Sequence, residues 1–185
     1  MKRNLSIVAA VLALAISSPA SPVYWFGNGT TEGGDGTWDT VTAHFSSSQS
    51  GPADTAWNNA VNPGDPVFEG AGGGVTLGGP LTNYGTIKLN SSYTFTNSTL
   101  WMLAPNAALD LEGSSILTVS NVFAGGPLVK NGSGTLWLSG LNVQGWTSNT
   151  VLNAGTLALG VGAGANLGAN GPYNHLVQVS VLNGA

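Results

Sequence analysis

The amino-acid sequence predicts an all-β protein, a right-handed parallel β-helix of roughly five coils preceded by a β-rich cap. The first observation is a strand unit written twice: a glycine turn followed by Thr-Leu-x-Leu lies at residues 134–138 and again at residues 155–159. The second is that glycines interrupt every stretch that could carry a helical period. One such unit cannot bury its apolar face, whereas stacked copies can, so the repeat favours a β-solenoid. Right-handed winding follows the general preference of parallel connections.

The spacing of the repeat sets the expected number of coils. Gly134 and Gly155, which open the two copies, are 21 residues apart, and looser copies lie at residues 85–89 and 107–111. Repetition of this period over residues 74–185 gives roughly five coils, with Leu, Val and Ile directed inward and Thr, Ser, Asn and Lys directed outward. Thr and Asn side chains aligned between coils would then hydrogen-bond to one another. Because the sequence ends in the middle of a coil, we expect either an N-terminal fragment of a longer protein or a degenerate secreted relative.

The first twenty residues have the three regions of a secretory signal peptide. Lys2 and Arg3 precede an apolar run over residues 5–16, and residues 18–20 are the small-residue sequence Ser-Pro-Ala. The apolar run is too short to span a membrane, and a buried N-terminal helix is the alternative. We therefore expect residues 1–20 to be removed on export.

Loss of this segment makes the chain more acidic. Lys88 and Lys130 are then the only basic residues against eight acids, a formal charge of about −6, and the chain has no cysteine. Nucleic-acid binding requires clustered basic side chains, so the charge excludes it. Without disulfides, stability must come from burial and backbone pairing.

The best full repeat, residues 126–160, includes both copies of the strand unit and carries an ordered set of motif positions. They are Leu128, Lys130, Gly132, Gly134, Thr135, Leu136, Leu138, Gly140, Asn153, Gly155, Thr156 and Leu157. In this order they resemble the passenger-associated β-strand repeat of bacterial autotransporter passenger regions. The resemblance implies an exported, non-catalytic segment at the cell surface or outside the cell, which serves as a structural stalk or adhesin and needs no cofactor. It also implies that the repeat assists export and folding, that a longer chain would end in an outer-membrane barrel translocator, and that the partner is a host surface or a polysaccharide.

Residues 21–73 differ in composition from the repeats. They contain Trp25, Trp38 and Trp57 and six of the eight acids. This stretch resembles the N-terminal module that opens many such passengers, although His44-Phe45 replaces the usual Asn-Trp. The resemblance implies a cap that covers the end of the solenoid, with the tryptophans as its hydrophobic content.

Catalytic and metal-binding patterns are weak in this chain. Residues 33–39 approach a calcium-binding repeat, but the aspartate comes one residue late, so Asp35 and Asp39 are interpreted as turn-capping residues. The carboxylates show no spacing that selects a glycosidase pair, and His44 and His175 belong to no nucleophile or metal pattern. The sequence thus predicts no enzyme, no catalytic residue and no metal site.

The tryptophans support an alternative function, a secreted carbohydrate-binding β-protein. Trp137 lies between Leu136 and Leu138, so it faces outward if the leucines face inward. Exposed indole rings at Trp101, Trp137 and Trp146 could then stack on sugars, above all if they formed one row.

Overall fold

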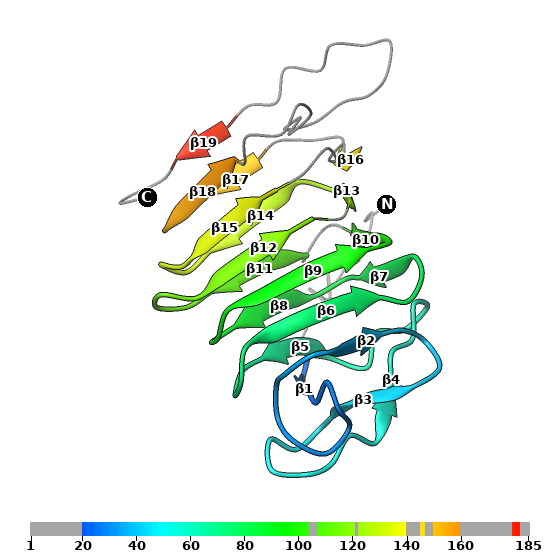
Figure 1. Cartoon of the computed structure of the whole chain (residues 1–185). Coiled ribbons are helices and arrows are strands. Elements are labelled where there is room, and N and C mark those ends of the chain that lie inside the picture. The colour runs from blue at the N-terminus through cyan, green and yellow to red at the C-terminus, as the bar shows by residue number, and fades with distance from the viewer. Residues whose placement is uncertain are drawn as a thin grey trace, which may run out of the picture.

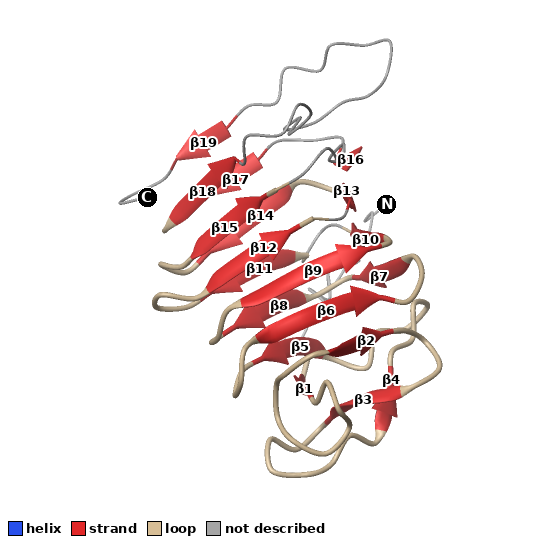
Figure 2. Ribbon diagram, in the orientation of Figure 1, coloured by secondary structure: helices blue, strands red, loops and turns tan. Residues whose placement is uncertain are grey.

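The computed structural model describes residues 20–103, 107–120, 122–139, 145–146, 150–159 and 179–181. The predicted signal peptide therefore lies outside the described residues, except for Ala20. Every regular element described is a β-strand, and the strands form three sheets (Figure 1, Figure 2). Across these ranges there is no helix long and apolar enough to cross a membrane. The all-β prediction is confirmed.

The largest sheet, called sheet I, has nine strands. In spatial order they are β19 (Val179–Val181), β17 (Thr150–Leu152), β14 (Leu128–Asn131), β11 (Ala108–Leu111), β8 (Thr86–Leu89), β5 (Asp65–Phe68), β1 (Pro22–Trp25), β3 (Ala43–Ser46) and β4 (Thr55–Ala56). The strands from β19 to β1 pair in parallel, whereas β3 is antiparallel to both β1 and β4.

The two smaller sheets are parallel throughout. Sheet II contains β18 (Thr156–Leu159), β15 (Thr135–Leu138), β12 (Ile116–Val119), β9 (Tyr93–Asn97), β6 (Gly73–Leu77) and β2 (Gly36–Trp38) in that order. Sheet III contains β16 (Gly145–Trp146), β13 (Val122–Gly125), β10 (Thr99–Met102) and β7 (Leu81–Asn83).

Each coil contributes one strand to each sheet. The four complete coils are β5-β6-β7, β8-β9-β10, β11-β12-β13 and β14-β15-β16, and β17 and β18 follow them. The parallel β-helix is therefore confirmed, with about four coils instead of five. The period holds, since the sheet I strands begin at residues 65, 86, 108, 128 and 150. The expected count was too high because it extended the period to residue 185, whereas β19 is the only strand described after β18.

The core lies between the three sheets and is built of columns of apolar side chains. In sheet II, Val75 pairs with Phe95, which pairs with Val119, which pairs with Leu138. All four side chains are buried. Because successive residues of a strand point to opposite faces, the parallel register places like positions of each coil on top of one another.

Aromatic side chains fill the N-terminal end of the core. Trp25, Trp38, Phe45, Trp57 and Phe68 are all buried, with neighbouring ring centroids 4.9–6.2 Å apart. Edge and tilted contacts at such separations are favourable for aromatic rings. The tryptophans of the N-terminal stretch thus belong to the hydrophobic core, and the strands β1 to β4 lie at the β5 end of the solenoid (Figure 1).

The edge of sheet III is covered by side chains instead of by another strand. The carbonyl oxygen of Thr82 in β7 accepts hydrogen bonds from Trp57 Nε1 at 2.9 Å and from Asn62 Nδ2 at 2.8 Å. The Thr82 amide donates to Asn59 Oδ1 at 2.9 Å, and the Tyr84 amide donates to Asn62 Oδ1 at 2.6 Å. Residues 57–62 therefore satisfy backbone groups that would otherwise template pairing with another chain.

Candidate functional site

The motif positions of the best repeat form one turn and the two strands beside it. Leu128 in β14 and Leu136 and Leu138 in β15 are buried, and Leu157 in β18 packs against the core cluster. Thr135 and Thr156 pair with each other across β15 and β18. Gly140 lies outside the described residues.

Lys130 points into the molecule, which corrects the prediction that lysines face outward. Its strand position pairs with Leu109 on one side and Leu152 on the other, in the inward column of sheet I. The residue is 1% exposed. The other lysine of the described chain, Lys88, does lie at the surface, where its ammonium is 3.5 Å from a carboxylate oxygen of Glu112.

The Lys130 ammonium is surrounded by carbonyl oxygens of two successive turns. Nζ donates to the carbonyl oxygens of Asn131 at 3.1 Å, Gly132 at 2.8 Å and Ala154 at 2.9 Å. An ammonium group has three donors, so these bonds use all of them. The first acceptor is the last residue of β14, the second lies in the turn directly after it, and the third lies in the turn after β17. We call this arrangement the lysine bridge, because it joins one coil to the next.

The motif glycines make room for the lysine bridge. Gly132 and Gly155 have positive φ values of 72° and 73°, in the left-handed region that L side chains rarely adopt. A Cβ atom at Gly155 would lie 2.7 Å from Lys130 Nζ and 2.6 Å from the Gly132 carbonyl oxygen. A Cβ at Gly134 would lie 2.8 Å from Ser115 Oγ. The spacing Lys-x-Gly-x-Gly therefore corresponds to a turn that packs closely against the turns of neighbouring coils.

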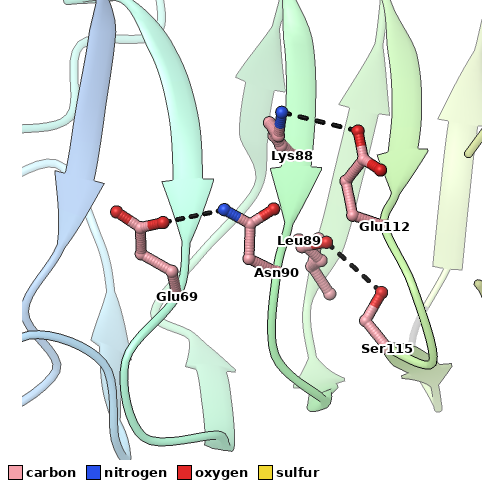
Figure 3. Close-up of polar contacts among 6 residues, drawn as sticks. All are labelled: Glu69, Lys88, Leu89, Asn90, Glu112 and Ser115. Carbon is pink, nitrogen blue, oxygen red and sulfur yellow. Dashed lines mark hydrogen bonds and ion pairs between the residues drawn. The ribbon is translucent and has the colours of Figure 1, made fainter.

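Other polar side chains also connect successive coils at these turns. Asn153 Nδ2 donates to Asn131 Oδ1 at 2.7 Å, as expected for aligned asparagines. Figure 3 shows the same behaviour earlier in the chain, where Asn90 Nδ2 donates to Glu69 Oε2 at 2.7 Å and Ser115 Oγ donates to the Leu89 carbonyl oxygen at 3.2 Å. Side-chain hydrogen bonds therefore join the same neighbouring coils that are already joined by backbone pairing between their strands.

Several carboxyl groups near the coils have raised pKa values. Burial, a hydrogen bond with the Glu69 carboxyl and the charge of Glu69 raise the pKa of Glu32. Burial also raises the pKa of Asp65, against the hydrogen bond from the Thr86 amide. For Asp110, burial and the charge of Glu112 raise the pKa. Burial lowers the pKa of Lys130, against the attraction of Asp110.

The raised pKa values of the three carboxyl groups predict that mild acid stabilises the protein. A carboxyl group whose pKa is raised in the folded state binds more protons there than in the unfolded state, so its contribution to stability is lost as pH rises through the folded pKa. We expect the thermal midpoint to rise as the pH falls through the raised folded-state pKa values of Glu32, Asp65 and Asp110. Glu32→Gln should raise the midpoint at the higher pH and flatten the dependence. A pH dependence equally steep in Glu32→Gln would contradict this assignment to Glu32.

The predicted turn-capping role is confirmed for Asp39, whereas Asp35 accepts its hydrogen bond from β6, 39 residues further along the chain. Asp39 Oδ1 accepts hydrogen bonds from the amides of Val41 at 2.8 Å and Thr42 at 2.6 Å, and Asp35 Oδ1 accepts one from the Gly74 amide at 2.6 Å. Across the described ranges, no three histidine or carboxylate side chains come together in a way that could hold a metal ion.

The three tryptophans considered for sugar stacking do not share one sheet. Trp101 in β10 is 43% exposed and Trp137 in β15 is 46% exposed. The exposure of Trp137 agrees with its position between the inward residues Leu136 and Leu138. Trp101 lies in sheet III and Trp137 in sheet II. Trp146 belongs to β16 in sheet III, and its side chain is outside the described part of the structure. Sequence reasoning missed Tyr84, which is 42% exposed.

Comparison with known proteins finds a protein whose sequence is similar to this chain. The chain is 32% identical over 188 residues to the protein named Adhesin BmaC autotransporter, from Brucella suis biovar 1 (strain 1330). The match covers 99% of this chain but 5% of the relative, so the chain spans about a twentieth of that protein's length. No family model matches the chain, and no solved structure matches it. The relative indicates an exported protein of the cell surface. Sequence similarity and the parallel β-helix together confirm the resemblance to an autotransporter passenger region.

Proposed function

We propose that the chain is a non-catalytic segment of an exported surface passenger, in which stacked coils form a stalk or adhesive surface and the repeat assists export by folding coil by coil. The observation that supports the proposal most is the lysine bridge, because it ties the turn of one coil to the turn of the next. The similarity to a relative named an adhesin supports an adhesive, non-enzymatic role. An outer-membrane translocator would then be the partner of the longer chain.

The physical basis of coil-by-coil folding is the short reach of the contacts. In the solenoid, a strand pairs with the strand one coil before it and one coil after it. The side-chain bonds between turns follow the same rule, since Asn131 reaches Asn153 and Lys130 reaches Ala154. A coil that emerges from a membrane can therefore fold on the coil already outside, without waiting for distant parts of the chain.

Export can be tested by display on bacteria. The chain would be joined to the outer-membrane translocator of an autotransporter, and the fraction reaching the surface measured by its accessibility to added protease. We expect Lys130→Met to lower the surface fraction several-fold and Lys88→Met to leave it unchanged. Equal export of both variants, with Lys130→Met shown to loosen the isolated protein, would contradict a role of the lysine bridge in export.

Carbohydrate binding is the second candidate function. It is supported by the two indole rings at Trp101 and Trp137, which are nearly half exposed although both strands carry ample buried apolar side chains. An adhesive surface that recognises a polysaccharide would combine both candidates.

A further inference from the structure

We propose that the outer face of sheet III binds a neutral polysaccharide through a platform formed by Trp101 and Tyr84. This inference deepens the carbohydrate-binding candidate and rests on it.

Two exposed aromatic residues are neighbours on this face. Trp101 is 43% exposed and Tyr84 is 42% exposed. Trp101 pairs in register with Thr82, and Tyr84 follows Thr82 by two residues, directly after the end of β7, where its side chain is exposed. With strands about 4.8 Å apart and a rise of about 3.3 Å per residue, their Cα atoms are about 8 Å apart. Two rings at this distance offer an extended apolar surface to the C–H faces of a sugar chain.

The backbone beneath the platform is held firmly. The Tyr84 amide donates to Asn62 Oδ1 at 2.6 Å, and Asn62 Nδ2 donates to the Thr82 carbonyl oxygen. Between these two residues, Asn83 is fully buried, and its Nδ2 donates to the Gly85 carbonyl oxygen at 2.6 Å. A platform fixed before binding loses less conformational entropy when the ligand arrives.

The distribution of charge selects the class of ligand. The described strands of sheet III contain no charged residue, and neither do those of sheet II. Charged strand residues lie on sheet I, at Asp65, Lys88, Asp110 and Lys130. The chain as a whole is acidic, with a formal net charge of −4. A polymer of uncharged sugars can approach sheet III without repulsion and without needing a cationic partner, whereas an acidic polymer meets a net negative molecule.

Trp137 provides an internal comparison. It is as exposed as Trp101 but lies on sheet II, where its large exposed neighbour is the aliphatic Ile116, at 38% exposure. Ile116 pairs with Thr135, two residues before Trp137. Among the described side chains, Trp137 thus has no exposed aromatic neighbour on sheet II, whereas Trp101 has the exposed ring of Tyr84 just beyond the end of β7.

The experiment measures retention of the protein on cellulose, on chitin and on immobilised mannan, with polygalacturonate as the acidic polymer. The variants are Trp101→Ala, Tyr84→Ala, Trp101→Phe and Trp137→Ala, each checked for an unchanged thermal midpoint. We expect retention on at least one neutral polymer, weakened about tenfold by Trp101→Ala and by Tyr84→Ala, and largely restored in Trp101→Phe. Trp137→Ala should bind as the parent does.

Three other results would overturn the proposal in distinguishable ways. If Trp137→Ala weakens binding while Trp101→Ala does not, sugar binding stands and its placement on sheet III is wrong. If polygalacturonate is retained in preference to the neutral polymers, the ligand class is wrong. If no polymer is retained, the carbohydrate-binding function itself fails, and the stalk or adhesin role is untouched.

Discussion

Leu136→Asp is expected to abolish the cooperative unfolding transition of the solenoid or to lower its free energy of unfolding by about 4 kcal/mol or more. The Leu136 side chain is fully buried, and its strand position pairs with Leu117 in one neighbouring coil and Leu157 in the other. A carboxylate there would sit in an apolar column with no described basic side chain facing it. Chemical denaturation followed by circular dichroism provides the measurement.

The control for this variant is the next residue along the strand. Trp137→Asp introduces the same charge at a position that is 46% exposed and faces solvent. Its effect on the denaturation midpoint should be small, since surface substitutions usually change stability by about 0.5 kcal/mol or less. If Leu136→Asp and Trp137→Asp unfold alike, the inward and outward assignments of sheet II are wrong.

Lys130→Met is expected to lower the free energy of unfolding by about 2 kcal/mol, because three carbonyl oxygens lose a charged donor at once. Methionine has a similar length and no donor, so it tests the hydrogen bonds more than the volume. Removing the buried ammonium also removes its desolvation cost, which by itself would stabilise the protein. Because three part-buried carbonyl oxygens are left without a donor, we expect the destabilising contribution to be larger.

The same substitution at the other lysine separates the lysine bridge from charge in general. Lys88 is 40% exposed at the side chain and forms a surface ion pair with Glu112, an interaction that contributes little to stability. Lys88→Met should therefore leave the denaturation midpoint nearly unchanged. Equal losses in both lysine variants would mean that net charge, and not the lysine bridge, governs the result.

Sequence reasoning was most successful for features that depend on a single strand, such as which of its side chains are buried. The alternation of Leu136, Trp137 and Leu138 predicted correctly which side chains are buried, because the period of two is a property of the strand itself. The same period places Lys130 on the inward face with Leu128, and the prediction failed there because residue type was given more weight than position. A lysine can occupy the core column only because a turn of the next coil supplies acceptors, which is a contact between coils.

Contacts between distant segments were beyond the reach of sequence reasoning. Asn59 and Asn62 look like ordinary loop residues, yet they satisfy the backbone at the edge of sheet III about twenty residues away. The exposed pair of Trp101 and Tyr84 likewise depends on the register between β7 and β10. No local pattern encodes such a register.

Amide hydrogen exchange of Lys130→Met, read coil by coil, tests the central claim most directly. If the lysine bridge transmits order from one coil to the next, exchange will rise in β17, in β18 and in the turn between them, while β5 and β8 keep their protection. Lys88→Met will show the exchange pattern of the parent protein. Unchanged exchange in β17 and β18, or an equal rise in every coil, would contradict the claim that the lysine bridge couples neighbouring coils.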